Sequence, residues 1–306
     1  MFDIIGKRFW FFLIASVVIL TCIISLATFG LKAGIEFSSG SLMTVRFDQE
    51  VSQGELENEL ASLGYTNVII QRSGEDDFLI RLPEMNSEAK SALETGLTAR
   101  FSTLMVGEFD AVSPIVAAET TRNAGIAVAV AAIGILFYIT WAFHRMPNPF
   151  RYGACAIVAL VHDALVAMGV FSILGGVLGW EINLMFVTGI LAVIGYSVNN
   201  TVVVFDRIRE NMMIDAKSGF EVVVNNSLVE TLGRSLNTAL TTLFVAVALL
   251  LFVGATIQNF AVVLVVGIIA GTYSSICIAP PLLVVWRKGE WGRFVPWLSR
   301  GKASGR

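Results

Sequence analysis

The chain has 306 residues, of which 55% are hydrophobic and only 15% are charged. Charged residues make up about a quarter of an ordinary soluble protein, so this composition excludes a soluble globular domain and indicates a membrane protein. The formal net charge of -3 points to no class of partner, because positive and negative residues are sorted along the chain.

Apolar runs define the predicted membrane spans. A helix needs about 20 apolar residues to cross a bilayer, and the sequence holds six such runs: Phe9 to Phe29, Ala124 to Phe143, Tyr152 to Leu178, Ile182 to Phe205, Leu236 to Val253 and Phe260 to Trp286. The first is too long for a signal peptide and is expected to be an uncleaved anchor. We predict an anchor span over residues 1–30, a five-span bundle over 122–290 and a cytoplasmic tail over 291–306.

Basic residues predict the orientation of these spans, since Lys and Arg accumulate in cytoplasmic loops. They occur before the first span and in every second connection after it, at Lys7, Arg8, Arg145, Arg151, Arg207, Arg209, Lys217, Arg234, Arg287, Lys288 and Arg293. Both termini are therefore predicted to be cytoplasmic. The long loop between the first two spans is predicted to be extracytoplasmic.

That loop, residues 31–121, is long enough to form a domain. Its pattern predicts, in order, a strand, a helix, a hairpin, a helix and a strand: Leu42 to Phe47, Ser52 to Leu63, Val68 to Arg72 with Phe78 to Leu82 turned at Gly74 to Asp77, Ser87 to Leu104, and Met105 to Val112. Ser52 and Glu55 have the spacing of a capping box at the first helix. The order βαββαβ predicts a ferredoxin-like domain, and its acids are expected to form a solvated surface rather than a binding site.

Four stretches carry a family resemblance. They are GIEFSSG, with Gly34, Glu36, Phe37 and Gly40; VALVHDALVAMGVFSILG from Val158; ILAVIGYSVNNTVVVFDRIREN, with Gly195, Asp206 and Arg207; and SLVETLGRSLNTALTTL from Ser227. In this order they resemble the motifs of the SecF branch of the SecD/SecF family of protein-export membrane proteins, within the RND superfamily. The resemblance covers nearly the whole chain.

The resemblance implies both a fold and a function. The expected fold is an α-helical membrane protein: a six-span RND-type half bundle with a ferredoxin-like α+β extracytoplasmic domain between spans one and two. The implied function is that of an auxiliary subunit of the Sec translocase in the cytoplasmic membrane of a prokaryote. It would work with SecD and the SecYEG channel, surrounded by membrane lipid, and use the proton-motive force to promote export of unfolded preproteins.

Two alternatives remain open: an RND-type exporter of small molecules or lipids, and a scaffold subunit uncoupled from any ion gradient. No enzymatic activity, cofactor, metal or nucleic-acid partner is predicted. The two histidines, His144 and His162, lack metal-ligand spacing, and the sequence has no phosphate-binding glycine loop.

Polar residues inside the predicted spans are candidates for function, because they are costly in a bilayer. Asn199 and Asn200 lie in the fourth span. Arg234, Thr238 and Thr241 of the fifth span recur every three or four residues and share one helical face. We expect the two amides to form hydrogen bonds with this face, each contributing on the order of 0.6 to 2 kcal/mol; the alternative to a functional role is that these residues only hold the two spans together.

The resemblance also raises the question of ion coupling. In the family, the position of Asn200 usually holds an aspartate that is proposed to carry a proton near an arginine aligned with Arg234. An amide does not titrate near neutral pH, which leaves three explanations: the cycle uses an acid of SecD, another acid of this chain substitutes, or Asn200 reflects a sodium-linked or uncoupled variant.

Asp163 is the first substitute to consider. It lies about eleven residues, hence roughly 16 Å, into the third span, and His162 precedes it. The alternative is that Asp163 only fixes helix packing. Asp206 and Arg207, at the membrane edge, are predicted to belong to a solvated, salt-bridged face.

Overall fold

The computed structural model describes residues 3–66, 68–73, 77–102, 104–215, 218–252 and 255–293. It divides the chain into two compact units. The helical unit comprises Met1–Gly30, Val128–Gly176 and Met185–Arg306, and the α+β unit comprises Leu31–Ala127 together with Val177–Leu184. The α+β unit thus includes the connection between the third and fourth spans, which the sequence analysis had assigned to the bundle.

Six helical segments of the described chain are long and apolar enough to cross a membrane, which confirms the predicted spans. They are α1 (Arg8–Phe29), α5 (Pro114–Ala142), α6 (Pro149–Leu178), α7 (Leu184–Ile214), α8 (Phe220–Phe252), and α9 (Ala255–Cys277) continued by α10 (Ala279–Lys288). Several begin earlier than predicted, because helical turns with polar residues extend beyond the apolar runs. Pro280 and Pro281 occupy the first turn of α10, which explains the break after α9.

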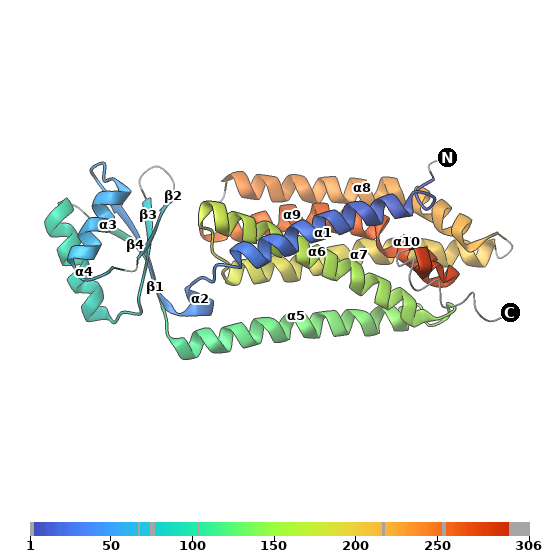
Figure 1. Ribbon diagram of the computed structural model, residues 1–306, viewed down its shortest axis with the longest axis horizontal. Helices are drawn as coiled ribbons and strands as arrows, with labels where there is room; N and C mark the ends of the chain where they lie inside the picture. The colour runs from blue at the N-terminus through green and yellow to red at the C-terminus, as the bar shows by residue number, and fades with distance from the viewer. Residues whose placement is uncertain are drawn as a thin grey trace. The chain divides into compact units, whose positions relative to one another are not determined.

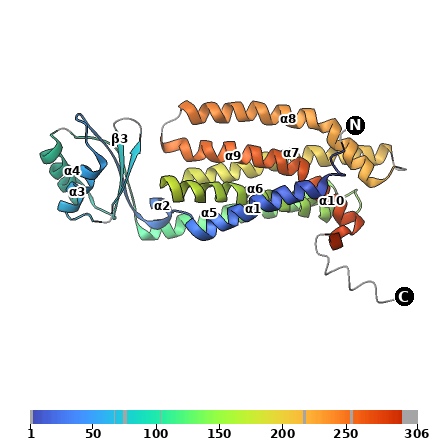
Figure 2. The ribbon, with the colours of Figure 1, turned by 45° about the horizontal axis from the view of Figure 1, so that its top comes forward.

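Helices α6, α7 and α9 form the centre of the helical unit. Helices α1 and α6 to α9 run side by side in it (Figures 1 and 2). Within the most apolar window of each span, 44% of the residues of α6 and of α7 and 56% of those of α9–α10 are buried, against 11% for α1 and 17% for α8. The peripheral helices therefore present apolar side chains outward, as helices in contact with lipid or a partner do.

The α+β unit has the predicted ferredoxin-like topology. Its elements follow in the order β1 (Gly40–Phe47), α3 (Gln53–Ser62), β2 (Ile69–Ser73), β3 (Asp77–Leu82), α4 (Ser87–Phe101) and β4 (Leu104–Val112), and the antiparallel sheet has the order β2-β3-β1-β4. The capping box of Ser52 and Glu55 is present at the start of α3. The predicted turn after β2 falls mostly on residues 74–76, outside the described residues.

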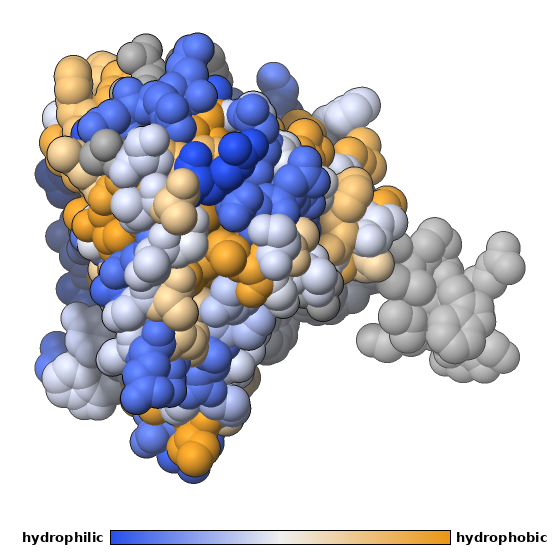
Figure 3. All heavy atoms as spheres, turned by 90° about the vertical axis from the view of Figure 1, so that its left-hand side faces the viewer, coloured by the Kyte–Doolittle hydropathy of each residue, from blue (hydrophilic) through white to orange (hydrophobic). Residues whose placement is uncertain are grey.

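Helices α3 and α4 cover one face of the sheet (Figure 1). Between them and the sheet lies a core that includes Met43, Val45, Leu56, Ile80 and Leu97, all buried. Seen from this end of the molecule, hydrophilic residues are interspersed with apolar areas on the surface (Figure 3). This surface fits the solvated role expected of the acidic residues.

The stretch GIEFSSG forms a short helix that the sequence analysis did not predict, α2 (Ile35–Ser38), followed directly by β1. Gly40 has φ +126°, and a Cβ there would lie 2.8 Å from the carbonyl oxygen of Leu82. A Cβ on Gly34 would lie 2.8 Å from the carbonyl oxygen of Ile182. Both glycines therefore permit close approach of two backbone segments.

Candidate functional site

Asp163 is the centre of a buried polar cluster in the helical unit. It lies near the middle of the 30-residue helix α6 and is only 2% exposed. Its Oδ2 accepts hydrogen bonds from Ser197 Oγ of α7 at 2.5 Å and from Ser274 Oγ of α9 at 2.8 Å. One carboxyl group thus joins the three central helices.

His162 lies against the other oxygen of this carboxyl group. Its Nδ1 is 3.0 Å from Asp163 Oδ1, so the two neighbours on α6 are in direct contact. Its ring lies 6.1 Å from the ring of Tyr273, whose hydroxyl donates to the backbone carbonyl of Phe11 in α1. The two serine hydroxyls donate to Oδ2, and His162 Nδ1 lies next to the other oxygen, Oδ1.

Asn200 is buried, but its partner is not the predicted one. Its Nδ2 donates to Ser275 Oγ of α9 at 2.7 Å, and the expected bond to the polar face of the fifth span is therefore wrong. Asn199, one position earlier, is exposed. Because Ser274 and Ser275 are adjacent, α9 contacts Asp163 with one serine and Asn200 with the next.

The predicted polar face of the fifth span is an exposed surface of α8. Arg234, Thr238 and Thr241 are all exposed, and the two threonine hydroxyls donate to backbone carbonyls of α8 itself. The three residues do share a face, as their spacing indicated, but this face is directed away from the buried cluster. Thr238 and Thr241 bond only within α8 among the described residues, whereas Arg234 also borders a hollow next to α7.

Asp206 and Arg207 belong to the salt-bridged face that the sequence predicted. Arg209 Nη2 lies 2.6 Å from Asp206 Oδ1, and Arg207 contacts Glu210 at 2.7 Å and Glu230 of α8 at 2.6 Å. With Arg234 and their neighbours these residues line a charged hollow of about 450 Å³ between α7 and α8. The charges in it are largely paired with one another.

The remaining motif residues have local roles. Glu36 and Phe37 are half-buried on α2. Gly195 is exposed, and a Cβ there would meet no atom within 4 Å in the described chain, so the structure does not explain it.

The sequence analysis missed the serines Ser197, Ser274 and Ser275. A usable signal was the glycine pair Gly267 and Gly271 on α9. A Cβ on Gly267 would lie 2.1 Å from Val193 Cγ2 of α7, and one on Gly271 would lie 2.9 Å from Ser197 Cβ. Small residues four positions apart let helices approach closely, so this spacing brings Ser275 of α9 within hydrogen-bonding reach of Asn200 on α7.

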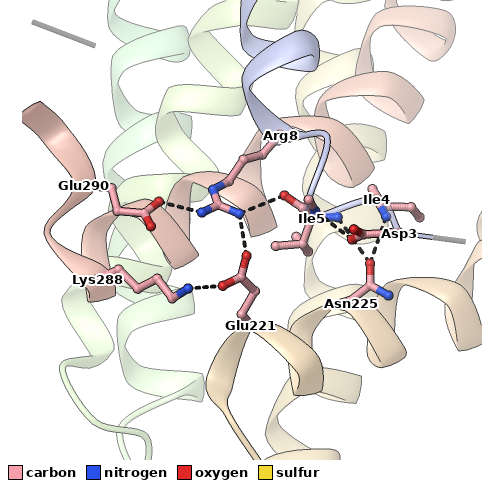
Figure 4. A network of polar contacts seen from close by, with 9 residues as sticks. Asp3, Ile4, Ile5, Arg8, Glu221, Asn225, Lys288 and Glu290 are labelled. Carbon is pink, nitrogen blue, oxygen red and sulfur yellow. Dashed lines mark hydrogen bonds and ion pairs between the residues drawn. The ribbon is translucent and has the colours of Figure 1, made fainter. Parts of the chain in front are cut away.

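A second polar cluster lies where the chain enters the helical unit (Figure 4). Arg8, expected as a loop charge, is only 4% exposed. Its Nη1 lies 2.5 Å from Glu221 Oε1 of α8, and its Nη2 lies 2.6 Å from Glu290 Oε2 in the 3₁₀ turn η1 (Glu290–Arg293). Asn225 accepts from the backbone amides of Ile4 and Ile5. This cluster fastens the first residues to the ends of two distant helices.

The six apolar helices and the small sheet define a multi-pass membrane protein that carries a ferredoxin-like unit. A family model for the C-terminal part of protein export membrane protein SecD/SecF matches residues 92–289, and one for the SecD/SecF GG motif matches residues 24–51. The chain belongs to the SecD/SecF family, which confirms the resemblance seen in its four motifs.

Two relatives illustrate this membership. Protein translocase subunit SecF of Anaerolinea thermophila is 42% identical, over 98% of each chain. Protein translocase subunit SecDF of Bacillus subtilis is 35% identical, over 94% of this chain but only 38% of its own length.

The crystal structure of SecDF from Thermus thermophilus, described as a translocon-associated membrane protein, matches with a TM-score of 0.83 at 30% identity. The match covers 94% of this chain, which spans 39% of that longer one. The comparison confirms the predicted fold class.

Proposed function

We propose that the chain is the SecF-type subunit of a Sec translocase, which works with SecD beside SecYEG and uses the proton-motive force to promote export of unfolded preproteins. Family membership supports the role in export. The Bacillus subtilis relative, named SecDF, is more than twice as long as the matched region, which supports a SecD-like half as the partner. A parallel repeat of this kind is common in transporters of related architecture.

The proposal includes an orientation in the cytoplasmic membrane. With both termini in the cytoplasm, Arg145, Arg151, Arg209 and Arg287 face the side on which basic residues accumulate. The α+β unit, in which Asp and Glu outnumber Lys and Arg, then lies outside, where it can meet an emerging preprotein.

Asp163 and His162 are proposed as the proton-carrying pair of this subunit. Asn200 cannot titrate near neutral pH, whereas the contact between Asp163 Oδ1 and His162 Nδ1 can hold or release one proton. Losing that proton changes how strongly the carboxyl group accepts the hydrogen bonds that Ser197 and Ser274 donate to it. The packing of α6 against α7 and α9 would respond. This buried contact is the observation on which the coupling role depends.

Arg234 is proposed to face the partner. A cation on a membrane helix needs an anionic or polar neighbour, and Arg234 is exposed at the rim of the charged hollow, where a partner can reach it. An acidic residue of SecD in contact with Arg234 would supply the charge that Asn200 lacks.

The test is preprotein translocation into proteoliposomes that contain SecYEG, the motor ATPase, SecD and this chain, with and without an imposed proton gradient. Asp163→Asn is expected to remove the stimulation by the gradient. Ser172→Ala is the matched control: Ser172 is also buried in α6, bonds to Ser25 of α1 at 3.0 Å, and does not contact Asp163.

Three results would contradict the proposal. Stimulation that survives Asp163→Asn would remove the proton-carrying role from this residue. Equal losses in Asp163→Asn and Ser172→Ala would indicate a packing role alone. No stimulation in the unaltered chain, together with stimulation created by Asn200→Asp, would favour an uncoupled scaffold subunit.

A further inference from the structure

The connection between α6 and α7, Val177–Leu184, is attached to the α+β unit through its backbone. The amide of Ile182 donates to the carbonyl of Lys32 at 2.7 Å, and the amide of Gly34 donates to the carbonyl of Ile182 at 2.8 Å. These two bonds form a parallel bridge between Ala33 and Ile182. The absence of a Cβ at Gly34 is what allows this approach.

Side chains of the sheet hold the same connection at two further points. Gln71 of β2 donates to the carbonyl of Gly179 at 2.6 Å. Arg81 of β3 contacts three groups: Nη1 donates to Glu181 and, at 2.8 Å, to the carbonyl of Ala33, while Nη2 donates to Ser38. The segment before the sheet and two of its strands are thereby joined to this connection.

The pair of Arg81 and Glu181 differs from a surface ion pair. Their side chains are only 20% and 16% exposed. Burial raises the pKa of the Glu181 carboxyl, and the Arg81 guanidinium acts in the opposite direction. Removing one partner of a half-buried pair leaves the other poorly solvated, so this contact resists opening more than exposed pairs do.

The connection joins two helices that contribute residues to the buried polar cluster. It follows α6, which carries Asp163, and precedes α7, which carries Ser197. These two residues are hydrogen-bonded to each other in the buried cluster. A change in their contact would act on α6 and α7, the two helices whose ends meet in this connection.

We propose that Val177–Leu184 is a mechanical link that transmits rearrangements at Asp163 to the base of the α+β unit, with Arg81 as its positioning residue. Residues 32–38 and the ends of β2 and β3 form this base. The use of the motion in export rests on the proposed function, but the link itself does not. The competing explanation is that the contacts only stabilise the α+β unit.

Hydrogen exchange on the full chain in lipid nanodiscs separates the two explanations. Asp163→Asn, and independently Ser274→Ala, perturb the buried cluster. Either change is expected to alter the exchange rate of residues 32–38 by about twofold or more. In the Arg81→Met background this response should disappear. The double exchange Arg81→Glu with Glu181→Arg should restore it.

Arg46→Met is the matched control. Arg46 also pairs with an acid of the sheet, contacting Asp77 at 2.6 and 2.8 Å, at the opposite end of β3 from Arg81. The response to Asp163→Asn should survive this change. If Arg81→Met unfolds the sheet, seen as fast exchange throughout β1 and β3, Glu181→Gln replaces it.

The link is overturned if the response to the cluster mutations persists without Arg81, or if it is absent from the chain with Arg81 intact. Translocation is assayed separately. If the exchange response depends on Arg81 but the proton gradient does not stimulate translocation, the link is supported and the proposed function is contradicted. Stimulation without transmission contradicts the link alone.

Discussion

Replacing Arg8 by Met is expected to release the first residues of the chain from the helical unit. Arg8 lies between the carboxylates of Glu221 and Glu290 and also donates to the carbonyl of Ile5 at 2.9 Å. Methionine keeps much of the apolar volume but provides no donor. The change therefore removes the three polar contacts with little change in packing.

The expected loss of stability depends on how well Glu221 and Glu290 are solvated once Arg8 no longer pairs with them. Removing one partner of a fully buried pair costs about 3 to 5 kcal/mol, and an exposed pair contributes about 0.2 to 1 kcal/mol. The side chains of Glu221 and Glu290 are 29% and 19% exposed, and Lys288 still contacts Glu221 after the change. We therefore expect a loss between the two limits, about 2 kcal/mol.

The backbone amides of Ile4 and Ile5 report this loss, because both are bound by Asn225 Oδ1, at 2.9 and 3.2 Å. A loss of about 2 kcal/mol in local opening corresponds to roughly 30-fold faster hydrogen exchange. Lys7→Met is the matched control, since it removes a positive charge that is exposed. Exchange that accelerates less than twofold in Arg8→Met, or equally in both variants, would refute this account of the cluster.

Two further predictions concern the α+β unit. Gly34→Ala places a Cβ 2.8 Å from the carbonyl oxygen of Ile182 and should lower stability by about 1 to 3 kcal/mol in thermal unfolding, whereas Gly54→Ala on α3, with no atom within 4 Å, should be neutral or stabilising. Ser52→Ala removes a helix cap and should cost about 1 kcal/mol. The Ser52 backbone and side chain hold the pKa of Glu55 below its ordinary value; this contribution is therefore present at neutral pH and lost as the pH falls through the folded-state pKa. Unfolding measured from pH 7 to pH 3 should show less acid-dependent loss in Ser52→Ala, and an unchanged pH profile would contradict the role of the cap.

The sequence predicts the elements of this protein well because they are local patterns. A run of about 20 apolar residues is a span whatever surrounds it, and alternation with capping residues predicts the order of strands and helices. The ends of the helices are less predictable. Helix α8 begins at Phe220, 16 residues before the apolar run at Leu236, because Glu221, Asn225, Asn226 and Glu230 interrupt the apolar pattern of its first turns.

Apolar runs and capping residues do not predict contacts between elements that are distant in the sequence. Nothing in the composition of Val177–Leu184 predicts that Arg81 and Gln71, about a hundred residues earlier, hold it. The buried position of Arg8 is hidden for the same reason. A basic residue before a span has the same sequence context whether it is solvated or bound between two carboxylates.

The incorrect prediction of a partner for Asn200 shows which feature of the sequence identifies neighbouring helices. Polar periodicity on the fifth span identified a face correctly, but periodicity cannot tell whether a face is turned toward a neighbouring helix or away from the chain. The relevant evidence was steric: Gly267 and Gly271 give α9, rather than α8, the smooth surface that α7 can approach closely. A helix that comes this near brings its own polar residues with it, so Ser274 and Ser275 bind Asp163 and Asn200. In a membrane bundle, small residues therefore identify the partner helix better than polar residues do, and polar residues left on the other faces indicate contacts with a different chain.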